Sequence, residues 1–325
     1  MRRLPALLVL LAVAGCTTTH ATSPAATSPS APSASTASAG PRHLAVHVLP
    51  WRLPGPLARE AVVPVGGARA VVAGGLLRGD TSSASSYTLD LGSGHAHRGA
   101  ALPVAVHDTA GALLAGHLLV FGGGNAAEQA VVQARAGRHW HVVGHLPQPR
   151  SDLAAVVAGG RVLVIGGYDG ATPALGEVLS TRDGVHWQRV ARLRVPVRYP
   201  GVAVLGGAVW VFGGERDGAM VPVVQRIALR SGRVSVAGRL PHPLGHEAVA
   251  VLGGRVLVAG GRTSADALTS RMWWFDPGSR RFTPAGRLPH KLADTAVVQG
   301  PDVAWLVGGE TPAFSARVLR AALVR

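Results

Sequence analysis

Residues 248–289 read AVAVLGGRVLVAGGRTSADALTSRMWWFDPGSRRFTPAGRLP, and this stretch contains every element of a unit that recurs along the chain. It holds four apolar segments, at 248–252, 256–259, 272–275 and 282–285, each bounded by glycine, proline or charged residues. Short apolar segments with such boundaries are typical of β-strands. The stretch therefore predicts four strands, with a glycine pair after the second and Leu-Pro after the fourth.

Both of these marks recur at a nearly constant spacing. The glycine pairs begin at Gly74, Gly122, Gly166, Gly213, Gly260 and Gly308, so their separations are 48, 44, 47, 47 and 48 residues. The second mark appears as Leu53-Pro54, Leu102-Pro103, Leu146-Pro147, Val195-Pro196, Leu240-Pro241 and Leu288-Pro289. A period of this length with strand-like content predicts a β-propeller, and six copies predict six blades.

The order of features in each unit resembles the kelch repeat. In that repeat an apolar strand, Gly-Gly, an aromatic-Asp-Pro turn such as Phe275-Asp276-Pro277, a last-strand aromatic and Leu-Pro follow one another. The resemblance covers residues 43–325 and implies an all-β, six-bladed kelch propeller with four antiparallel strands per blade. The family's aromatic after Gly-Gly is present only as Tyr168, and the third or fourth strand is unclear in the first two units. Such a resemblance is informative about fold and says little about chemistry.

The two ends of the repeat region predict how the ring closes. After the last glycine pair only one apolar segment remains, at 316–321, so the final blade is one strand short. Residues 43–49 precede the first Leu-Pro, where a fourth strand belongs. We expect this N-terminal strand to complete the C-terminal blade, which would leave no open sheet edge.

The first sixteen residues have the pattern of an export signal. Arg2 and Arg3 precede an apolar run at 4–13, which is too short to span a bilayer. Val13-Ala14-Gly15-Cys16 resembles the lipobox of bacterial lipoproteins, which implies cleavage before Cys16 and a lipid on its thiol. We therefore expect a signal peptide at 1–15 and a protein anchored on the outer face of the cytoplasmic membrane.

Composition divides the rest of the chain into a tether and a globular domain. Residues 17–42 are almost entirely Ser, Thr, Pro and Ala, which cannot bury enough apolar surface to become ordered. We expect the lipidated cysteine and a disordered tether at 16–42, followed by the propeller at 43–325. The formal charge of +15 falls by two with the signal peptide, to +13, and favours anionic surroundings. Because no basic run is interleaved with aromatic residues, we expect no binding of nucleic acid. We also expect a monomer.

A ligand site is expected on the face that carries the long loops. Four of the turns between first and second strands are glycine pairs with hardly a side chain to offer, whereas the opposite face has the longer loops. Six residues beyond each Leu-Pro mark, at the entry of each first strand, lie Arg59, Asp108, Asp152, Gly201, His246 and Asp294. The glycine pairs are followed by further charges at Glu215, Arg262 and Glu310.

Together these positions predict a ring of mixed charge around the mouth of the central channel. The predicted binding residues are Arg59, Asp108, Asp152, Glu215, His246, Arg262, Asp294 and Glu310. The favoured hypothesis is a binding module for a protein, a peptide or a cell-wall glycan. An equally simple interpretation is that these polar side chains only satisfy loop backbone.

The alternative hypothesis is an enzyme. Some six-bladed bacterial kelch proteins are sugar epimerases resembling the sialic-acid mutarotase, and that resemblance would place the chemistry on Arg59, His246, Glu247 and Glu310. Copper-radical oxidases resembling galactose oxidase are excluded, because they need a core cysteine and Cys16 is the only one.

No metal or other cofactor is expected either. The histidine pairs His95/His97 and His139/His141 have a spacing that suits a metal, but they fall on outer strands away from the channel mouth.

Overall fold

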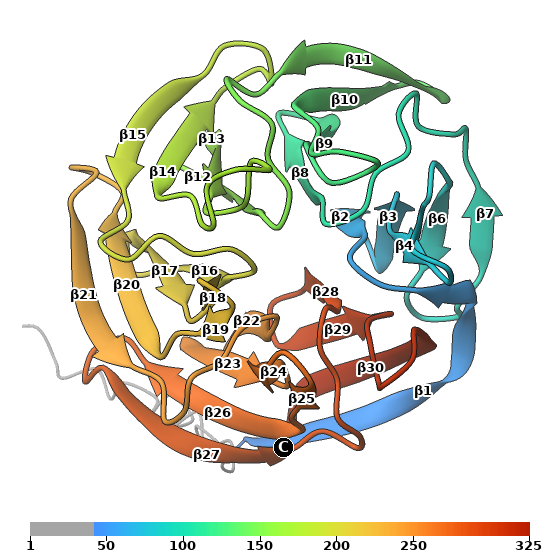
Figure 1. Ribbon diagram of the computed structural model, residues 1–325. Coiled ribbons are helices and arrows are strands. Elements are labelled where there is room, and N and C mark those ends of the chain that lie inside the picture. The colour runs from blue at the N-terminus through green and yellow to red at the C-terminus, as the bar shows by residue number, and fades with distance from the viewer. Residues whose placement is uncertain (1–41) are drawn as a thin grey trace, which may run out of the picture. The chain divides into compact units, whose positions relative to one another are not determined.

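Residues 42–325 are described by the computed structural model, and every regular element in this range is a β-strand. Six four-stranded antiparallel sheets surround a central axis, one per blade (Figure 1). The predicted six-bladed, all-β propeller is therefore confirmed. The signal peptide, Cys16 and the tether up to residue 41 were predicted for residues that lie outside this range. Within residues 42–325, no helix has the length and apolar character needed to cross a bilayer.

Each blade runs from an inner strand at the axis to an outer strand at the rim. Blade 1 consists of β2 (Ala61–Gly66), β3 (Arg69–Ala73), β6 (Ser86–Asp90) and β7 (Ala96–Arg98). Blade 2 consists of β8 (Ala110–Leu114), β9 (His117–Phe121), β10 (Val131–Ala136) and β11 (His139–His145). Blade 3 consists of β12 (Ala154–Ala158), β13 (Arg161–Ile165), β14 (Glu177–Thr181) and β15 (Gln188–Arg192).

The second half of the ring repeats this order. Blade 4 consists of β16 (Gly201–Leu205), β17 (Ala208–Phe212), β20 (Val223–Ala228) and β21 (Val234–Arg239). Blade 5 consists of β22 (Ala248–Leu252), β23 (Arg255–Ala259), β26 (Arg271–Asp276) and β27 (Arg281–Arg287). Blade 6 consists of β28 (Ala296–Gln299), β29 (Val303–Val307), β30 (Ser315–Val324) and β1 (His43–Leu57). Two-residue and three-residue strands form small hairpins after the second strands of blades 1, 4 and 5: β4 (Leu76–Leu77) with β5 (Thr81–Ser82), β18 (Glu215–Arg216) with β19 (Ala219–Met220), and β24 (Arg262–Ser264) with β25 (Ala267–Leu268).

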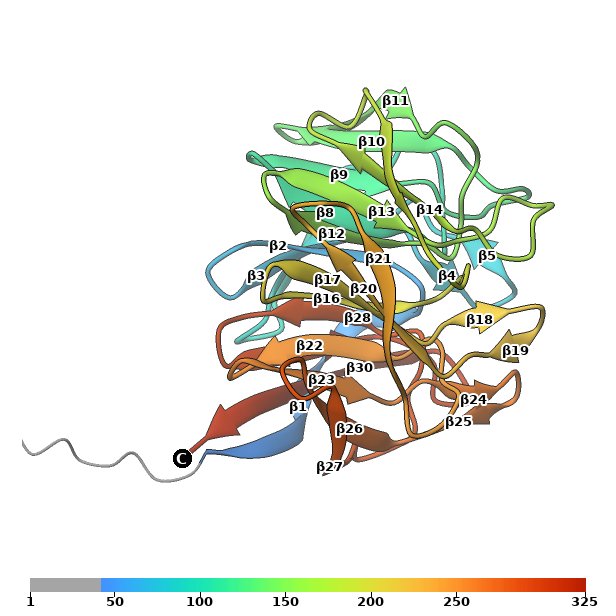
Figure 2. The ribbon, with the colours of Figure 1, turned by 90° about the vertical axis from the view of Figure 1, so that its left-hand side faces the viewer.

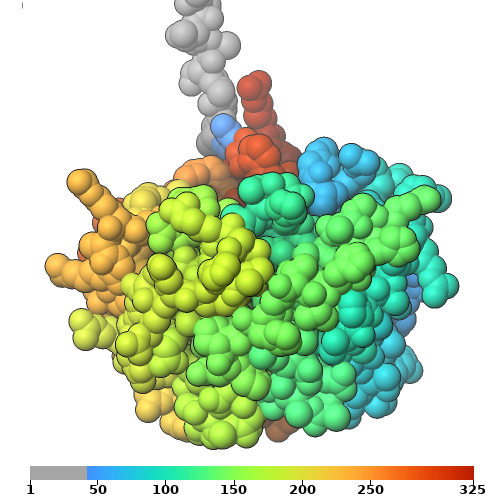
Figure 3. All heavy atoms as spheres, turned by 90° about the horizontal axis from the view of Figure 1, so that it is seen from above, coloured from blue at the N-terminus to red at the C-terminus, as the bar shows by residue number. Residues whose placement is uncertain are grey.

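The ring closes as the sequence predicts, through pairing of β1 with β30. His43 pairs with Val324, and the antiparallel register continues to Val48 and Leu319 before it is interrupted by bulges. In Figure 3 the start of β1 and the end of β30 lie side by side at one edge of the domain. Both strands are longer than predicted, so the pairing between the two ends of the domain extends along β30 from Val324 to Ser315.

The core lies between neighbouring blades. Second strands such as β17 are buried on both faces, because each blade is covered by one neighbour on either side. Between blades 4 and 5, for example, Trp210 and Phe212 pack against Phe275. Burial of each such aromatic side chain contributes roughly 2–3 kcal/mol.

The glycine pairs couple each blade to the next through backbone contacts. In every blade the amide of the second glycine donates to a carbonyl of the following blade, as Gly214 does to Leu244 at 2.9 Å. A Cβ on the preceding glycine, Gly213, would lie 2.1 Å from that same carbonyl oxygen. Both glycines also have positive φ, at 47° and 99°. The pair therefore recurs because close approach and backbone angle each exclude other residues.

The two ends of the propeller differ, and we name them by their connections. The turn face holds the tight turns between first and second strands, and the loop face holds the longer connections with hairpins β4–β5, β18–β19 and β24–β25. In Figure 2 these hairpins lie on one side of the domain, and the start of β1 and the C-terminus lie on the other. The described chain therefore begins and ends at the turn face.

Candidate functional site

Six residues with unusual backbone geometry surround the axis at the loop-face end of the channel. They precede the six inner strands, one per blade, and we call them the axial ring: Arg59, Asp108, Asp152, Tyr199, His246 and Asp294. Their φ angles lie between 50° and 60°, in the left-handed region that costs a non-glycine residue about 1–3 kcal/mol. Backbone hydrogen bonds join five of the six neighbouring pairs, as from the Tyr199 amide to the Asp152 carbonyl at 2.8 Å. Such geometry at the same position of every blade marks a candidate functional site.

The ring corrects one position of the sequence analysis. Counting from Val195-Pro196 pointed to Gly201 in blade 4, but the structural equivalent is Tyr199. The amide of Leu193 donates to the Gly176 carbonyl at 2.8 Å. In other blades the amide of the Leu in Leu-Pro makes the equivalent hydrogen bond. Leu193 is six residues before Tyr199, so the same count finds the correct residue once Leu193 replaces Val195 as the mark. Gly201 lies inside β16 instead.

A second shell of positions lies beside the ring. The residue before each ring member forms an antiparallel bridge with the residue after the glycine pair, as Arg198 does with Glu215 and Gly245 with Arg262. Glu215 and Arg262, two of the predicted binding residues, are the first residues of hairpin strands β18 and β24 and therefore belong to this shell. Glu310, bridged to Ala293, is the third.

The ring residues of blades 5 and 6 form a dense ionic cluster with this second shell. His246 Nδ1 is 2.5 Å from Asp294 Oδ1, and His246 Nε2 is 3.4 Å from Glu215 Oε2. Arg262 donates through Nε to Asp294 Oδ2 at 3.1 Å and through Nη2 to Glu310. Asp294 thus accepts from two cations while its side chain is only 2% exposed.

Opposite charges in this cluster stabilise one another. Although burial opposes a charge on the imidazole, Asp294 and Glu215 raise the pKa of His246 to about 9. The His246 hydrogen bond, followed by Arg198, lowers the pKa of Glu215 to about 2. Burial alone would raise the pKa of Asp294, but His246, Arg59 and Arg262 together hold it below its usual range. At neutral pH the cluster therefore consists of ionised groups of both signs.

The ring residues of blades 1 to 4 are held by two further arginines. Arg59 donates through Nη1 to Asp108 Oδ2 and to the Tyr199 hydroxyl, both at 3.3 Å, and through Nε to Glu310. Arg198 pairs with Glu215 and reaches Asp152 Oδ2 at 3.5 Å. The Tyr199 ring stacks on His246, with ring centroids 3.9 Å apart.

Asp108 and Asp152 differ from the other carboxyl groups of the site. Burial, opposed by Arg59, raises the pKa of Asp108 to about 6, and burial together with Asp108 raises that of Asp152 to about 7. Asp108 Oδ1 is buried without a hydrogen-bond partner. Two carboxyl groups with pKa values near neutrality can exchange protons under physiological conditions.

All eight residues predicted as a binding set thus lie at or beside the ring; a ligand role for them stays a prediction. Sequence reasoning missed Tyr199, Arg198 and His107, of which the first two were recoverable from the Leu193 count. Glu247, a candidate of the enzyme hypothesis, is buried and accepts from the Gly201 amide at 3.2 Å between blades 4 and 5. It lines the channel cavity together with ring residues such as His246.

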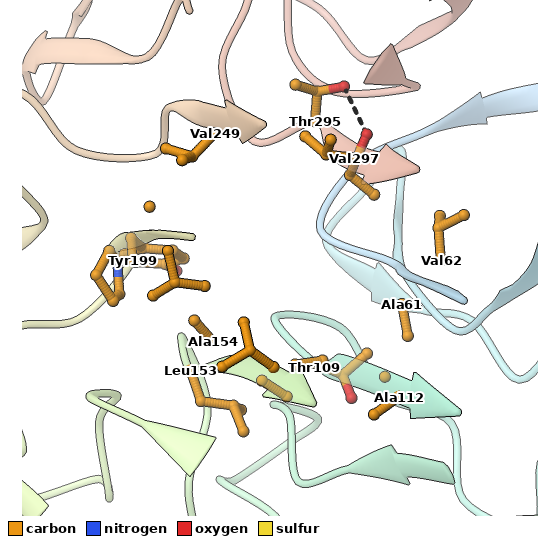
Figure 4. A pocket seen from close by; sticks show the side chains of 18 of the residues that line it. Ala61, Val62, Thr109, Ala112, Leu153, Ala154, Tyr199, Val249, Thr295 and Val297 are labelled. Atoms are coloured by element: carbon orange, nitrogen blue, oxygen red, sulfur yellow. Dashed lines mark hydrogen bonds between the residues drawn. The ribbon is translucent and has the colours of Figure 1, made fainter. Parts of the chain in front are cut away.

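The main cavity lies along the channel on the turn-face side of the ring. It measures about 680 Å³ and is bounded by ring residues at one end and by residues such as Pro64, Val157 and Gln299 at the other. Figure 4 shows side chains of several blades, among them Thr109, Tyr199 and Val249, around its open centre. Glu215, Arg262 and Glu310 do not line this cavity and face the loop side. Within residues 42–325, no cluster of three or more His, Cys, Asp or Glu is placed to hold a metal.

Comparisons with known proteins agree with this architecture. Residues 243–289 match one model of the kelch motif and residues 149–181 match another. A solved structure titled "Structure of YjhT" superposes with a TM-score of 0.72 at 15% sequence identity, over 84% of this chain and 95% of that chain. No curated protein matches the sequence. At that identity the likeness is one of fold, and with the two motif matches it identifies the chain as a six-bladed β-propeller that carries kelch motifs.

Proposed function

We propose that this chain is an exported, lipid-anchored binding protein that recognises an acidic cell-wall glycan at the loop face of the axial ring. The propeller fold with kelch motifs suggests a binding module, and the lipobox-like sequence at Cys16 supports the export and the anchor. The recognition itself rests on one observation, the arrangement of three arginines at the channel mouth.

These arginines are the most accessible charges of the site. The side chains of Arg198, Arg59 and Arg262 are 28%, 22% and 12% exposed, whereas those of Asp108 and Asp294 are 6% and 2% exposed. The carboxylates of Asp108 and Asp294 are therefore less accessible than the three guanidinium groups, whereas those of Glu215 and Glu310, at 11% and 10%, are nearly as exposed as Arg262. Guanidinium groups bind carboxylate and phosphate through paired hydrogen bonds, so an acidic ligand fits this edge.

Shape supports a slender ligand over a flat one. Arg262 is the first residue of β24, and Arg198 bridges to Glu215 at the start of β18. Hairpins β18–β19 and β24–β25, which lie on the loop face (Figure 2), therefore flank two of the three arginines. An acidic sugar at a chain end or in a thin polymer can reach such a recessed position. A protein partner would have to insert a single loop.

The test compares two arginine variants of the full-length protein. Arg198→Gln removes the most exposed of the three guanidinium groups while keeping a donor for Glu215. The control, Arg192→Gln, removes a guanidinium that is 64% exposed on the outer strand β15. Retention of purified cell-wall glycan should fall about tenfold or more with Arg198→Gln, stay unchanged with Arg192→Gln, and weaken with salt. Equal retention by Arg198→Gln and the native chain would refute glycan recognition at the ring, and retention of envelope protein alone would assign the ring to a protein partner.

A sugar epimerase is the second candidate, and the paired carboxyl groups of Asp108 and Asp152 favour it. Their pKa values near neutrality beside a 680 Å³ cavity suit general acid and base roles. Exchange between sugar anomers, followed by NMR, should then be faster with the native protein than with Asp152→Asn. Equal exchange rates would exclude this candidate.

A further inference from the structure

A second group of polar residues lies at the channel mouth, where blade 1 meets blade 2. Hairpin β4–β5 of blade 1 brings Ser82 to His107, which precedes the inner strand of blade 2 and bridges to Gly124 after that blade's second strand. Ser82 Oγ is 2.8 Å from His107 Nδ1, and His107 Nε2 is 3.5 Å from Asp108 Oδ2. Among the hydroxyl contacts within residues 42–325, this is the one whose partner is an imidazole.

The hydrogen-bond partners determine which nitrogen of His107 carries the proton. Burial and the charge of Arg59 lower the pKa of His107, so the ring is neutral at pH 7. Asp108 Oδ2 lies 3.5 Å from Nε2 and also accepts from Arg59, and because an ionised carboxylate can only accept, this contact favours the tautomer with the proton on Nε2. Nδ1 is then an acceptor, and the Ser82 hydroxyl donates to it at 2.8 Å in preference to the Gly124 carbonyl, which lies 3.5 Å away. The result is a hydroxyl polarised by a neutral imidazole that a carboxylate orients.

A glycine beside His107 leaves space for the imidazole ring. The position after Gly-Gly is Gly124 in blade 2, and a Cβ there would lie 3.1 Å from the His107 ring. Backbone hydrogen bonds between His107 and Gly124, of 3.0 and 2.6 Å, fix the histidine backbone. The His107 side chain is 19% exposed and Ser82 is half-buried, so a small molecule can reach the hydroxyl from the loop face.

We propose that Ser82, His107 and Asp108 form a serine-nucleophile site that hydrolyses carboxylic esters of small acyl groups. The Ser82 oxygen attacks the ester carbonyl carbon while its proton passes to His107 Nδ1. The ester C–O bond breaks, the leaving alcohol takes that proton, and an acyl group remains on Ser82. Water then attacks the acyl carbon and gives a proton to His107, which returns it to Ser82 as the carboxylic acid leaves.

Charge around the site sets the pH dependence. Asp108 faces Arg59, Tyr199, His246, Asp294 and Asp152, and its pKa is raised to about 6. His107 faces Arg59, Asp152, Asp80 and Glu128.

The reaction needs a neutral His107 and an ionised Asp108. Both are present once Asp108 is ionised, so the rate of ester hydrolysis should rise between about pH 5 and pH 7 and then level off. Arg59 donates to Asp108 Oδ2, the carboxylate oxygen that faces His107, and so supplies positive charge beside these two side chains. This activity does not depend on glycan binding at the ring.

The test uses the purified full-length protein with p-nitrophenyl acetate and a fluorophosphonate probe. The probe should attach to Ser82, located by mass spectrometry of tryptic peptides, and Ser82→Ala should reduce hydrolysis at least about tenfold. His107→Gln should have a similar effect, because it removes the acceptor nitrogen. The matched control is Ser93→Ala, whose hydroxyl donates to Asp90 in an exposed turn. Hydrolysis at the same rate by the native protein and Ser82→Ala, or a native protein that the probe leaves unmodified at Ser82, would overturn the proposal.

Discussion

The buried carboxyl group of Glu60 should make the propeller less stable as pH rises. Glu60 follows Arg59, is 5% exposed, and neither of its carboxyl oxygens has a hydrogen-bond partner. Burial is the main cause that raises its pKa from 4.5 to about 8. Because the folded-state pKa lies above the unfolded one, the folded chain favours the protonated form. The destabilisation therefore begins above about pH 4.5 and is complete above about pH 8.

The size of the effect follows from the pKa difference. At about 1.36 kcal/mol per unit, ionisation of Glu60 costs the folded state about 1 kcal/mol at pH 5, about 3 kcal/mol at pH 7 and nearly 5 kcal/mol at pH 9. Glu60→Gln removes the titration and keeps the shape of the side chain. The free energy of unfolding of Glu60→Gln should therefore exceed that of the native protein by an amount that grows with pH.

Urea unfolding followed by tryptophan fluorescence at pH 5, 7 and 9 measures this difference. A second variant, Glu60→Thr, copies the equivalent residues of blades 2 and 6, where the Thr109 and Thr295 hydroxyls donate to Phe121 and Val307 carbonyls. It should show the same growth with pH. A difference that stays constant from pH 5 to pH 9 in both variants would refute the reasoning.

Two further predictions concern the glycine pairs and the anchor. Gly213→Ala places a Cβ against the Leu244 carbonyl and should lower the free energy of unfolding by at least about 3 kcal/mol. The control Gly206→Ala has a similar φ, of 59°, but no atom within 4 Å of its Cβ, and should lower it by about 1 kcal/mol. Equal losses in urea unfolding would contradict a role of the glycine pair in blade-to-blade contact. Cys16→Ala should release the protein from the membrane fraction and abolish incorporation of radiolabelled palmitate, and a variant that still fractionates with membranes would show that the anchor is elsewhere.

The repeated glycine pairs predict most of the fold, because the backbone at these positions can only be formed by glycine. Gly213 and Gly214 must be glycine to approach Leu244, so the pairs are visible in the sequence without any knowledge of packing. Ring closure was predictable for a similar reason, since a blade with three strands exposes an edge that the N-terminal strand can fill. Both features depend on local chemistry repeated at a constant period.

The site was predictable only where it follows the repeat. Counting from Leu-Pro located five ring members, and it failed at Tyr199 because no proline follows Leu193 directly and Val195-Pro196 was used as the mark instead. Arg150 is fully buried where the other blades have an aliphatic residue, and its guanidinium donates to the Gly166 and Glu177 carbonyls. Nothing in the sequence distinguishes it from a surface arginine.

The contact between Ser82 and His107 was not predictable either. It depends on how far hairpin β4–β5 leans toward the next blade, and the position of His107 is not a histidine in any other blade. Loop conformation decides such pairs, and periodicity carries no information about it.

Recognition of an acidic ligand at the arginine edge of the axial ring is tested most directly by a crystal structure of the protein with its retained glycan. The account predicts a carboxylate or phosphate oxygen about 3 Å from the guanidinium groups of Arg198, Arg59 or Arg262, on the loop face. Glycan bound at the rim or the turn face, with the three arginines unoccupied, would contradict it.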